Sequence, residues 1–139
     1  MMVQLDPAYQ LALADMMIGI CSFMGGFSAT IFVTLLTLAK PGLFARIAIG
    51  ASAFAAVAFI ICLNSAVSIS FALHPNAPEM VKDAPLQSLQ LTMAASFMLG
   101  ITAMLGSIGV AGWIRSRALG IFTSTIAGIG FLVALGQIT

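Results

Sequence analysis

Residues 16–46, MMIGICSFMGGFSATIFVTLLTLAKPGLFAR, indicate how the whole chain is built. No charge interrupts residues 16–39, and Lys40-Pro41-Gly42 follows directly. About 20 mostly apolar residues are enough for a helix to cross a hydrocarbon core of ~30 Å. Proline removes a backbone donor and glycine permits a tight reversal. The stretch therefore predicts a membrane-spanning helix that ends in a short turn.

Three more runs of this kind follow, at residues 43–73, 89–114 and 118–138. Their apolar and polar residues do not alternate as membrane β-strands would require, so we expect helices. Asp6-Pro7 is typical of a helix start, which extends the first helix to Pro7. We expect an all-α polytopic membrane protein, a single domain over residues 1–139. Its helices would cover about 7–39, 43–73, 86–114 and 117–138, paired as two hairpins that pack as a four-helix bundle.

Composition places the chain in lipid. Hydrophobic residues make up 61% of its 139 residues, charged residues make up 6%, and the mean hydropathy is +1.15. A water-soluble fold of this size would expose several long apolar runs to water, which soluble domains avoid. The net charge of +1 provides no basic field for nucleic acid. The predicted partner is the lipid bilayer, and nucleic-acid binding is excluded.

The charges in the connections predict the topology. Lys40, Arg46, Arg115 and Arg117 flank the two short turns, whereas Lys82 is the one Lys or Arg in the proline-rich segment at 74–85. Cytoplasmic loops carry the excess of Lys and Arg. We therefore expect the turns at 40–46 and 115–117 to be cytoplasmic, and both termini and the 74–85 loop to be outside. The expected location is the inner (plasma) membrane of a bacterium.

Small residues recur at four-residue spacing on all four spans. Such faces let helix backbones approach closely in a bilayer, so we expect them to be packing contacts. They are Ser22, Gly26 and Thr30 in the first span, Ala48, Ser52 and Ala56 in the second, Ser96 and Gly100 in the third, and Gly120, Ser124 and Gly128 in the fourth.

The first and third spans also resemble each other. SFMGGFSA at 22–29 aligns with SFMLGITA at 96–103. The alternatives are chance similarity within a small apolar alphabet and a parallel internal repeat about an axis along the membrane normal. If the repeat is real, the first and third spans should play equivalent roles, and so should the second and fourth.

A few polar residues are candidates for interhelical contacts or a polar path. An amide in hydrocarbon must find partners, so Asn64, with Ser68 one turn away, would join helices or contact a solute. Asp15 is the one carboxylate near a span, and it either sits in the outer headgroup layer or attracts cations at an outer mouth. The threonine hydroxyls can also bond to their own helix. This stripe consists of Thr30, Thr34 and Thr37.

No catalytic, cofactor or metal site is predicted. Cys21 and Cys62 lie in spans at different apparent depths, so we expect two small buried residues rather than a disulfide or metal pair. His74 is the one histidine and stands before a proline at a helix end. Without titratable groups inside the spans, proton-coupled transport and membrane enzymes are both disfavoured.

Two functional classes remain. The first is a non-enzymatic structural or interaction subunit, which self-associates or joins a larger membrane complex through its packing faces. The absence of ionisable residues within the spans favours this class. The alternative is a passive oligomeric pore or small-solute or cation channel, lined by Asn64, Ser68 and the threonine stripe with Asp15 at its mouth. The lining of the central axis would distinguish the two classes.

Overall fold

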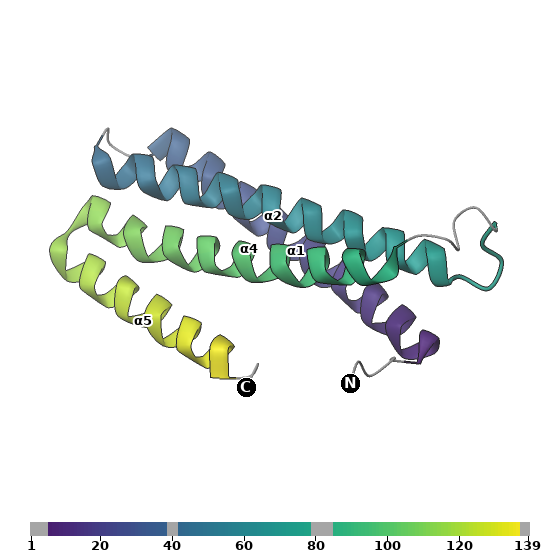
Figure 1. Cartoon of the computed structure of the whole chain (residues 1–139). Coiled ribbons are helices and arrows are strands. Elements are labelled where there is room, and N and C mark those ends of the chain that lie inside the picture. The colour runs from purple at the N-terminus through teal and green to yellow at the C-terminus, as the bar shows by residue number, and fades with distance from the viewer. Residues whose placement is uncertain (1–5, 39–41, 79–84, 137–139) are drawn as a thin grey trace.

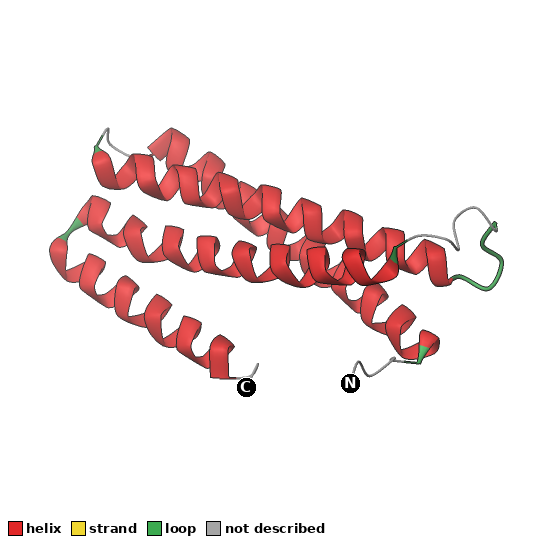
Figure 2. Ribbon diagram, in the orientation of Figure 1, coloured by secondary structure: helices red, strands yellow, loops and turns green. Residues whose placement is uncertain are grey.

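The structure, a computed structural model, describes residues 6–38, 42–78 and 85–136. It contains four helices and no strand in these ranges, which confirms the all-α class (Figures 1 and 2). The helices are α1 (Pro7–Leu38), α2 (Leu43–Leu73), α4 (Leu86–Arg115) and α5 (Arg117–Gly136). Within the described residues, these bounds agree with the four predicted spans.

Three of the helices are long and apolar enough to cross a bilayer. The helices α1, α2 and α4 contain 32, 31 and 30 residues. At 1.5 Å per residue each is about 45–48 Å long, which exceeds a hydrocarbon core of ~30 Å. The 20 residues of α5 form a shorter apolar helix. The chain is therefore a membrane protein whose three long helices have room to extend beyond the hydrocarbon.

Local hydrogen bonds explain where two helices begin. The Ala8 N–H donates to the Asp6 carboxylate over 3.0 Å, so Asp6 caps α1 as the sequence predicts. The Leu119 N–H donates to the Ser116 hydroxyl over 3.2 Å at the start of α5. Ser116 is the single residue between α4 and α5. The second hairpin therefore turns more tightly than the predicted helix bounds required.

The helices pack in sequence order. Extensive contacts join α1 to α2, α2 to α4, and α4 to α5. Figure 1 shows α5 diverging from the other three helices after the α4–α5 turn, with its other faces uncovered. The described chain is thus a bundle of α1, α2 and α4 with α5 on one flank. A single chain therefore does not form the closed four-helix bundle that the sequence predicted.

Small residues let the three long helices approach one another. The buried side of α2 is dominated by alanine, serine and cysteine, with Phe59 and Ile69 as its large members. Phe59 is fully buried, and its ring meets Phe97 of α4 edge-on at a centroid distance of 6.2 Å. A Cβ atom at Gly100 would lie 2.9 Å from Phe59 Cε1, and one at Gly25 would lie 3.4 Å from Phe59 Cβ. Phe59 therefore fills space that these two glycines leave open.

The two ends of the molecule differ in charge. The end of α1, the start of α2 and the α4–α5 turn lie at one end, and the end of α2 and the start of α4 lie at the other (Figure 1). Arg46, Arg115 and Arg117 are exposed at the turn end, while Lys40 is outside the described residues. Trp113 stacks on Phe44 at this end with 5.9 Å between ring centroids. The helix pairing expected from the sequence is therefore present, while the orientation in the membrane remains a prediction.

The first and third spans are not equivalent within one chain. Ser96 and Gly100 of α4 are buried, whereas the aligned Ser22 and Gly26 of α1 are exposed. The reason is their place in the packing order, because α4 lies between α2 and α5 while α1 has one extensive neighbour. The equivalent roles expected from an internal repeat are therefore wrong for the isolated chain.

Candidate functional site

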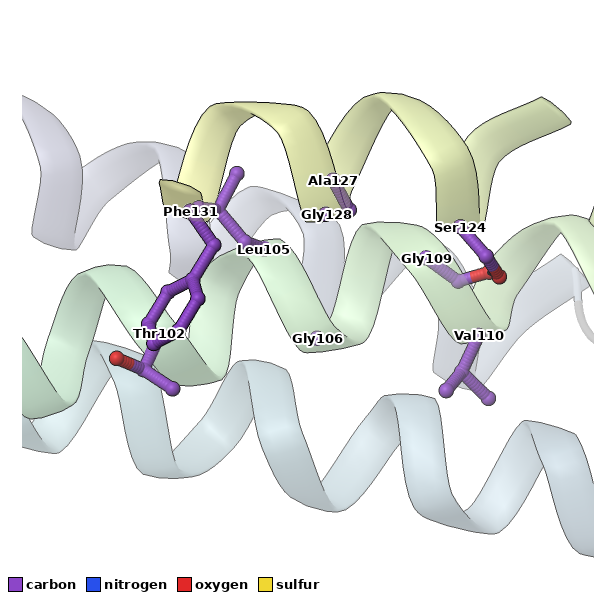
Figure 3. Close-up of a pocket in the computed structure, with 9 residues that line it drawn as sticks. All are labelled: Thr102, Leu105, Gly106, Gly109, Val110, Ser124, Ala127, Gly128 and Phe131. Atoms are coloured by element: carbon purple, nitrogen blue, oxygen red, sulfur yellow. The ribbon is translucent and has the colours of Figure 1, made fainter. Parts of the chain in front are cut away.

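A groove of about 330 Å³ runs between α4 and α5. Figure 3 shows Thr102 and Phe131 at one end and Val110, Gly109 and Ser124 at the other. Most of the lining is small or apolar. The lining residues are Thr102, Leu105, Gly106, Gly109, Val110, Ser124, Ala127, Gly128 and Phe131.

Hydroxyl groups of α5 hold the turn end of this groove together. Thr123 and Ser124 both donate to the Gly109 carbonyl, at 3.0 and 3.2 Å. Ser124 in turn accepts a hydrogen bond of 3.0 Å from the Trp113 indole. Gly120 is buried, and a Cβ there would lie 2.5 Å from Trp113. Beyond these contacts the helices separate, and Gly128 has open space at its Cβ position.

Gly112→Ala is expected to weaken the docking of α5 on α4. The new Cβ would collide with the Thr123 hydroxyl and lie 2.7 Å from the Leu119 carbonyl oxygen, which is rigid backbone. Overpacking of this kind costs roughly 1–3 kcal/mol. Gly106→Ala is the matched control, because nothing lies within 4 Å of its Cβ position. Proteolysis near the α4–α5 turn in detergent should accelerate in Gly112→Ala alone; equal rates in both variants would contradict this contact.

The predicted packing residues of α1 do not contact the rest of the chain as expected. Ser22, Gly26 and Thr30 are exposed, and nothing lies within 4 Å of a Cβ at Gly26. The neighbouring Gly25 is the glycine that meets Phe59. Within one chain, the predicted small-residue face of α1 therefore points away from the interhelical core.

The polar candidates on α1 and α2 lie on exposed surfaces. Each threonine hydroxyl donates to the carbonyl of its own helix four residues back, over 2.9 Å for Thr30, 2.8 Å for Thr34 and 3.0 Å for Thr37. Asn64 and Ser68 are exposed on α2, and Ser68 donates to the Asn64 backbone carbonyl over 2.9 Å. No hydrogen bond joins the Asn64 amide to another described residue. The structure does not bring these groups together around one path.

Asp15 joins α1 and α2 near the end where α2 finishes and α4 begins. Its carboxylate accepts a hydrogen bond of 2.8 Å from the Ser70 hydroxyl of α2. At the same end, the Gln90 amide of α4 donates to the Gln10 side-chain oxygen of α1 over 3.0 Å. Asp15 itself is exposed. These polar pairs suit the parts of the long helices that extend toward the headgroups, where water can solvate them.

A buried hydrogen bond between α2 and α4 was not predicted. The fully buried Ser107 hydroxyl donates to the Ala48 carbonyl over 2.8 Å. A serine in an apolar run can equally donate to a carbonyl of its own helix, so the sequence alone does not distinguish that bond from one to a neighbouring helix. The inward face of α1 could have been predicted from small residues spaced seven apart, namely Ala14, Cys21 and Ser28, all of which are buried.

The two cysteines are buried and free, as predicted, but they lie at the same depth in the core. Cys21 of α1 and Cys62 of α2 are neighbours in the same buried core cluster. The antiparallel α1–α2 hairpin brings them to one depth, because the turn near residue 40 is almost equally far from both. The assignment to different depths is therefore wrong.

No group of three or more His, Cys, Asp or Glu side chains that could hold a metal is found among the described residues. Comparison of the chain with protein families, curated proteins and solved structures finds no match.

Proposed function

We propose that the protein is a small structural or interaction subunit of a bacterial inner membrane that associates with copies of itself or with other membrane helices. The observation that carries this proposal is the Asn64 amide, which is exposed on a membrane helix and lacks a hydrogen-bond partner among the described residues. In hydrocarbon an unpaired amide costs free energy, which a second helix can recover. The open positions at Gly26 and Gly128 support the same proposal, since they permit close approach of another backbone.

Asn64→Leu is expected to weaken this association. Interhelical hydrogen bonds in membranes contribute about 0.6–2 kcal/mol, so the dissociation constant in detergent should rise roughly 3-fold to 30-fold. Ile61→Leu is the matched control, because Ile61 is also exposed on α2 but is apolar. Sedimentation equilibrium over a range of detergent concentrations measures the change. If both variants associate as the wild type does, Asn64 is not at the interface.

The proposed topology places the arginine-rich turns in the cytoplasm and the 74–85 connection outside. In a background without native cysteines, Ala77→Cys should react with an impermeant thiol reagent on intact cells. Ser116→Cys should react only after the cells are opened, because Ser116 lies in the turn between α4 and α5. Reaction of Ser116→Cys alone on intact cells would reverse the topology.

The alternative proposal, an oligomeric pore, has less support. The exposed threonine hydroxyls are already satisfied by carbonyls of α1, and Asp15 is engaged by Ser70. A pore would therefore have to form between chains. Cation flux into liposomes that falls in Asp15→Asn would favour the pore, because the carboxylate raises the local cation concentration. If the protein is well incorporated into the liposomes and no cation flux is measured, the pore is contradicted and the interaction subunit is favoured.

A further inference from the structure

Helix α2 keeps one exposed face although it packs against two neighbours. Its extensive contacts are with α1 and α4, while α5 packs on the opposite side of α4 (Figure 1). Along the remaining face, exposed residues follow one another at alternating steps of four and three. This α2 stripe consists of Gly50, Phe54, Val57, Ile61, Asn64 and Ser68. An average step of 3.5 residues is the spacing of the seam between two helices that supercoil around each other.

Lipid can cover the apolar members of the α2 stripe but cannot satisfy its amide. Phe54, Val57 and Ile61 are 53%, 55% and 44% exposed, and lipid tails are as apolar as these side chains. Arg46 is exposed near the start of α2, where its charge favours the edge of the hydrocarbon. Asn64 lies 18 residues further on, about 27 Å at the helical rise, so its amide stays inside a core of ~30 Å. The amide has no hydrogen-bond partner among the described residues.

A second copy of the chain supplies the complement to this amide. An asparagine side chain carries both a donor and an acceptor, so two of them can bond reciprocally. Copies inserted in one orientation are related by a twofold axis along the membrane normal, which sets a residue near the axis opposite itself. Antiparallel copies would instead set Asn64 opposite Gly50 or Phe54, whose side chains cannot bond with an amide. Parallel copies also let Phe54 of one chain pack beside Gly50 of the other, where nothing lies within 4 Å of the Cβ position.

We propose that the α2 stripe is a parallel homodimer interface in which Asn64 of each copy bonds with Asn64 of the other across the twofold axis. The inference rests on the proposed self-association and names its partner and register. A single polar residue in an otherwise apolar seam fixes the register, because a shift of one helix leaves the amides unpaired. Ser68 does not compete for these amides, since its hydroxyl donates to the Asn64 backbone carbonyl.

The test is disulfide crosslinking of full-length single-cysteine chains in the membranes of the cells that express them, in a background without the native cysteines. Ile61→Cys and Ser68→Cys should form disulfide-linked dimers with a membrane-permeant oxidant. Ile60→Cys is the matched control and should stay monomeric, because Ile60 is 54% exposed on α2 but lies outside the stripe. At an expression level where most chains are monomeric, adding Asn64→Leu should lower the dimer yield of Ile61→Cys roughly 3-fold to 30-fold. Asn64→Gln, which keeps an amide, should lower it less.

The contradicting outcomes separate this interface from self-association in general. Dimers that form through Ile129→Cys on the exposed face of α5, but not through Ile61→Cys, would overturn the α2 interface and leave self-association standing. A disulfide between Gly50→Cys and Ser68→Cys chains made in one cell would overturn the parallel arrangement, because these positions lie about 27 Å apart along the helix. Absence of crosslinks at every position, together with absence of energy transfer between labelled chains, would overturn the interface and self-association alike.

Discussion

Phe59→Ala is expected to cause the largest loss of stability of any single core substitution. Phe59 is fully buried, and it packs against Gly25, Phe97 and Gly100 from two other helices. Truncating a buried phenylalanine costs about 3–5 kcal/mol in water-soluble proteins. Lipid replaces water around separated membrane helices, so the packing loss dominates and we expect the lower bound, about 3 kcal/mol.

The measurement is unfolding in mixed micelles with a rising fraction of SDS, followed by circular dichroism. Phe54→Ala is the matched control, because Phe54 lies on the same helix but its side chain is 53% exposed. It should unfold close to the wild-type midpoint. An equal shift of the midpoint in both variants would show that Phe59 does not occupy a central packed position.

Gly100→Leu is expected to give the second large effect. A Cβ atom at this position would lie 2.9–3.1 Å from three atoms of the Phe59 ring, and leucine adds three further carbons beyond it. The ring also packs against Phe97 of α4, and its Cβ atom lies against Gly25 of α1, so the side chain has little room to move. Overpacking in cores costs roughly 1–3 kcal/mol, and we expect the upper part of that range.

Gly106→Leu is the control for this substitution, because it lies on the same helix with open space around its Cβ position. The same unfolding assay should show a lower SDS midpoint for Gly100→Leu and little change for Gly106→Leu. A destabilised Gly106→Leu beside an unchanged Gly100→Leu would contradict the arrangement of α2 and α4.

The helices could be predicted from the sequence because a membrane span requires little more than a long apolar run with a residue at each end that starts or stops a helix. Long apolar runs with almost no charge predicted the helices, and Asp6 and Ser116 lie where helices start or turn. The pairing of helices followed from the short turns. The open placement of α5 was not predictable, because its apolar surface is equally compatible with lipid and with another helix.

The contacts between helices were harder to predict because small residues occur on every face of the long helices. Gly26 was predicted to be packed and Gly25 was not, yet the structure places Gly25 against Phe59 and leaves Gly26 open. A shift of one residue rotates a helix position by about 100°, which is enough to exchange the two faces. The contact between Cys21 and Cys62 was missed for a different reason, since counting residues from the shared turn would have placed them at one depth.

We propose that exposed polar and small residues of this membrane protein bind another copy of the chain. The most direct measurement is energy transfer between donor-labelled and acceptor-labelled chains in liposomes, at a series of protein-to-lipid ratios. We expect transfer that exceeds random proximity, declines on dilution in lipid according to mass action, and is reduced by Asn64→Leu. Transfer that never exceeds the random level at any ratio would contradict self-association.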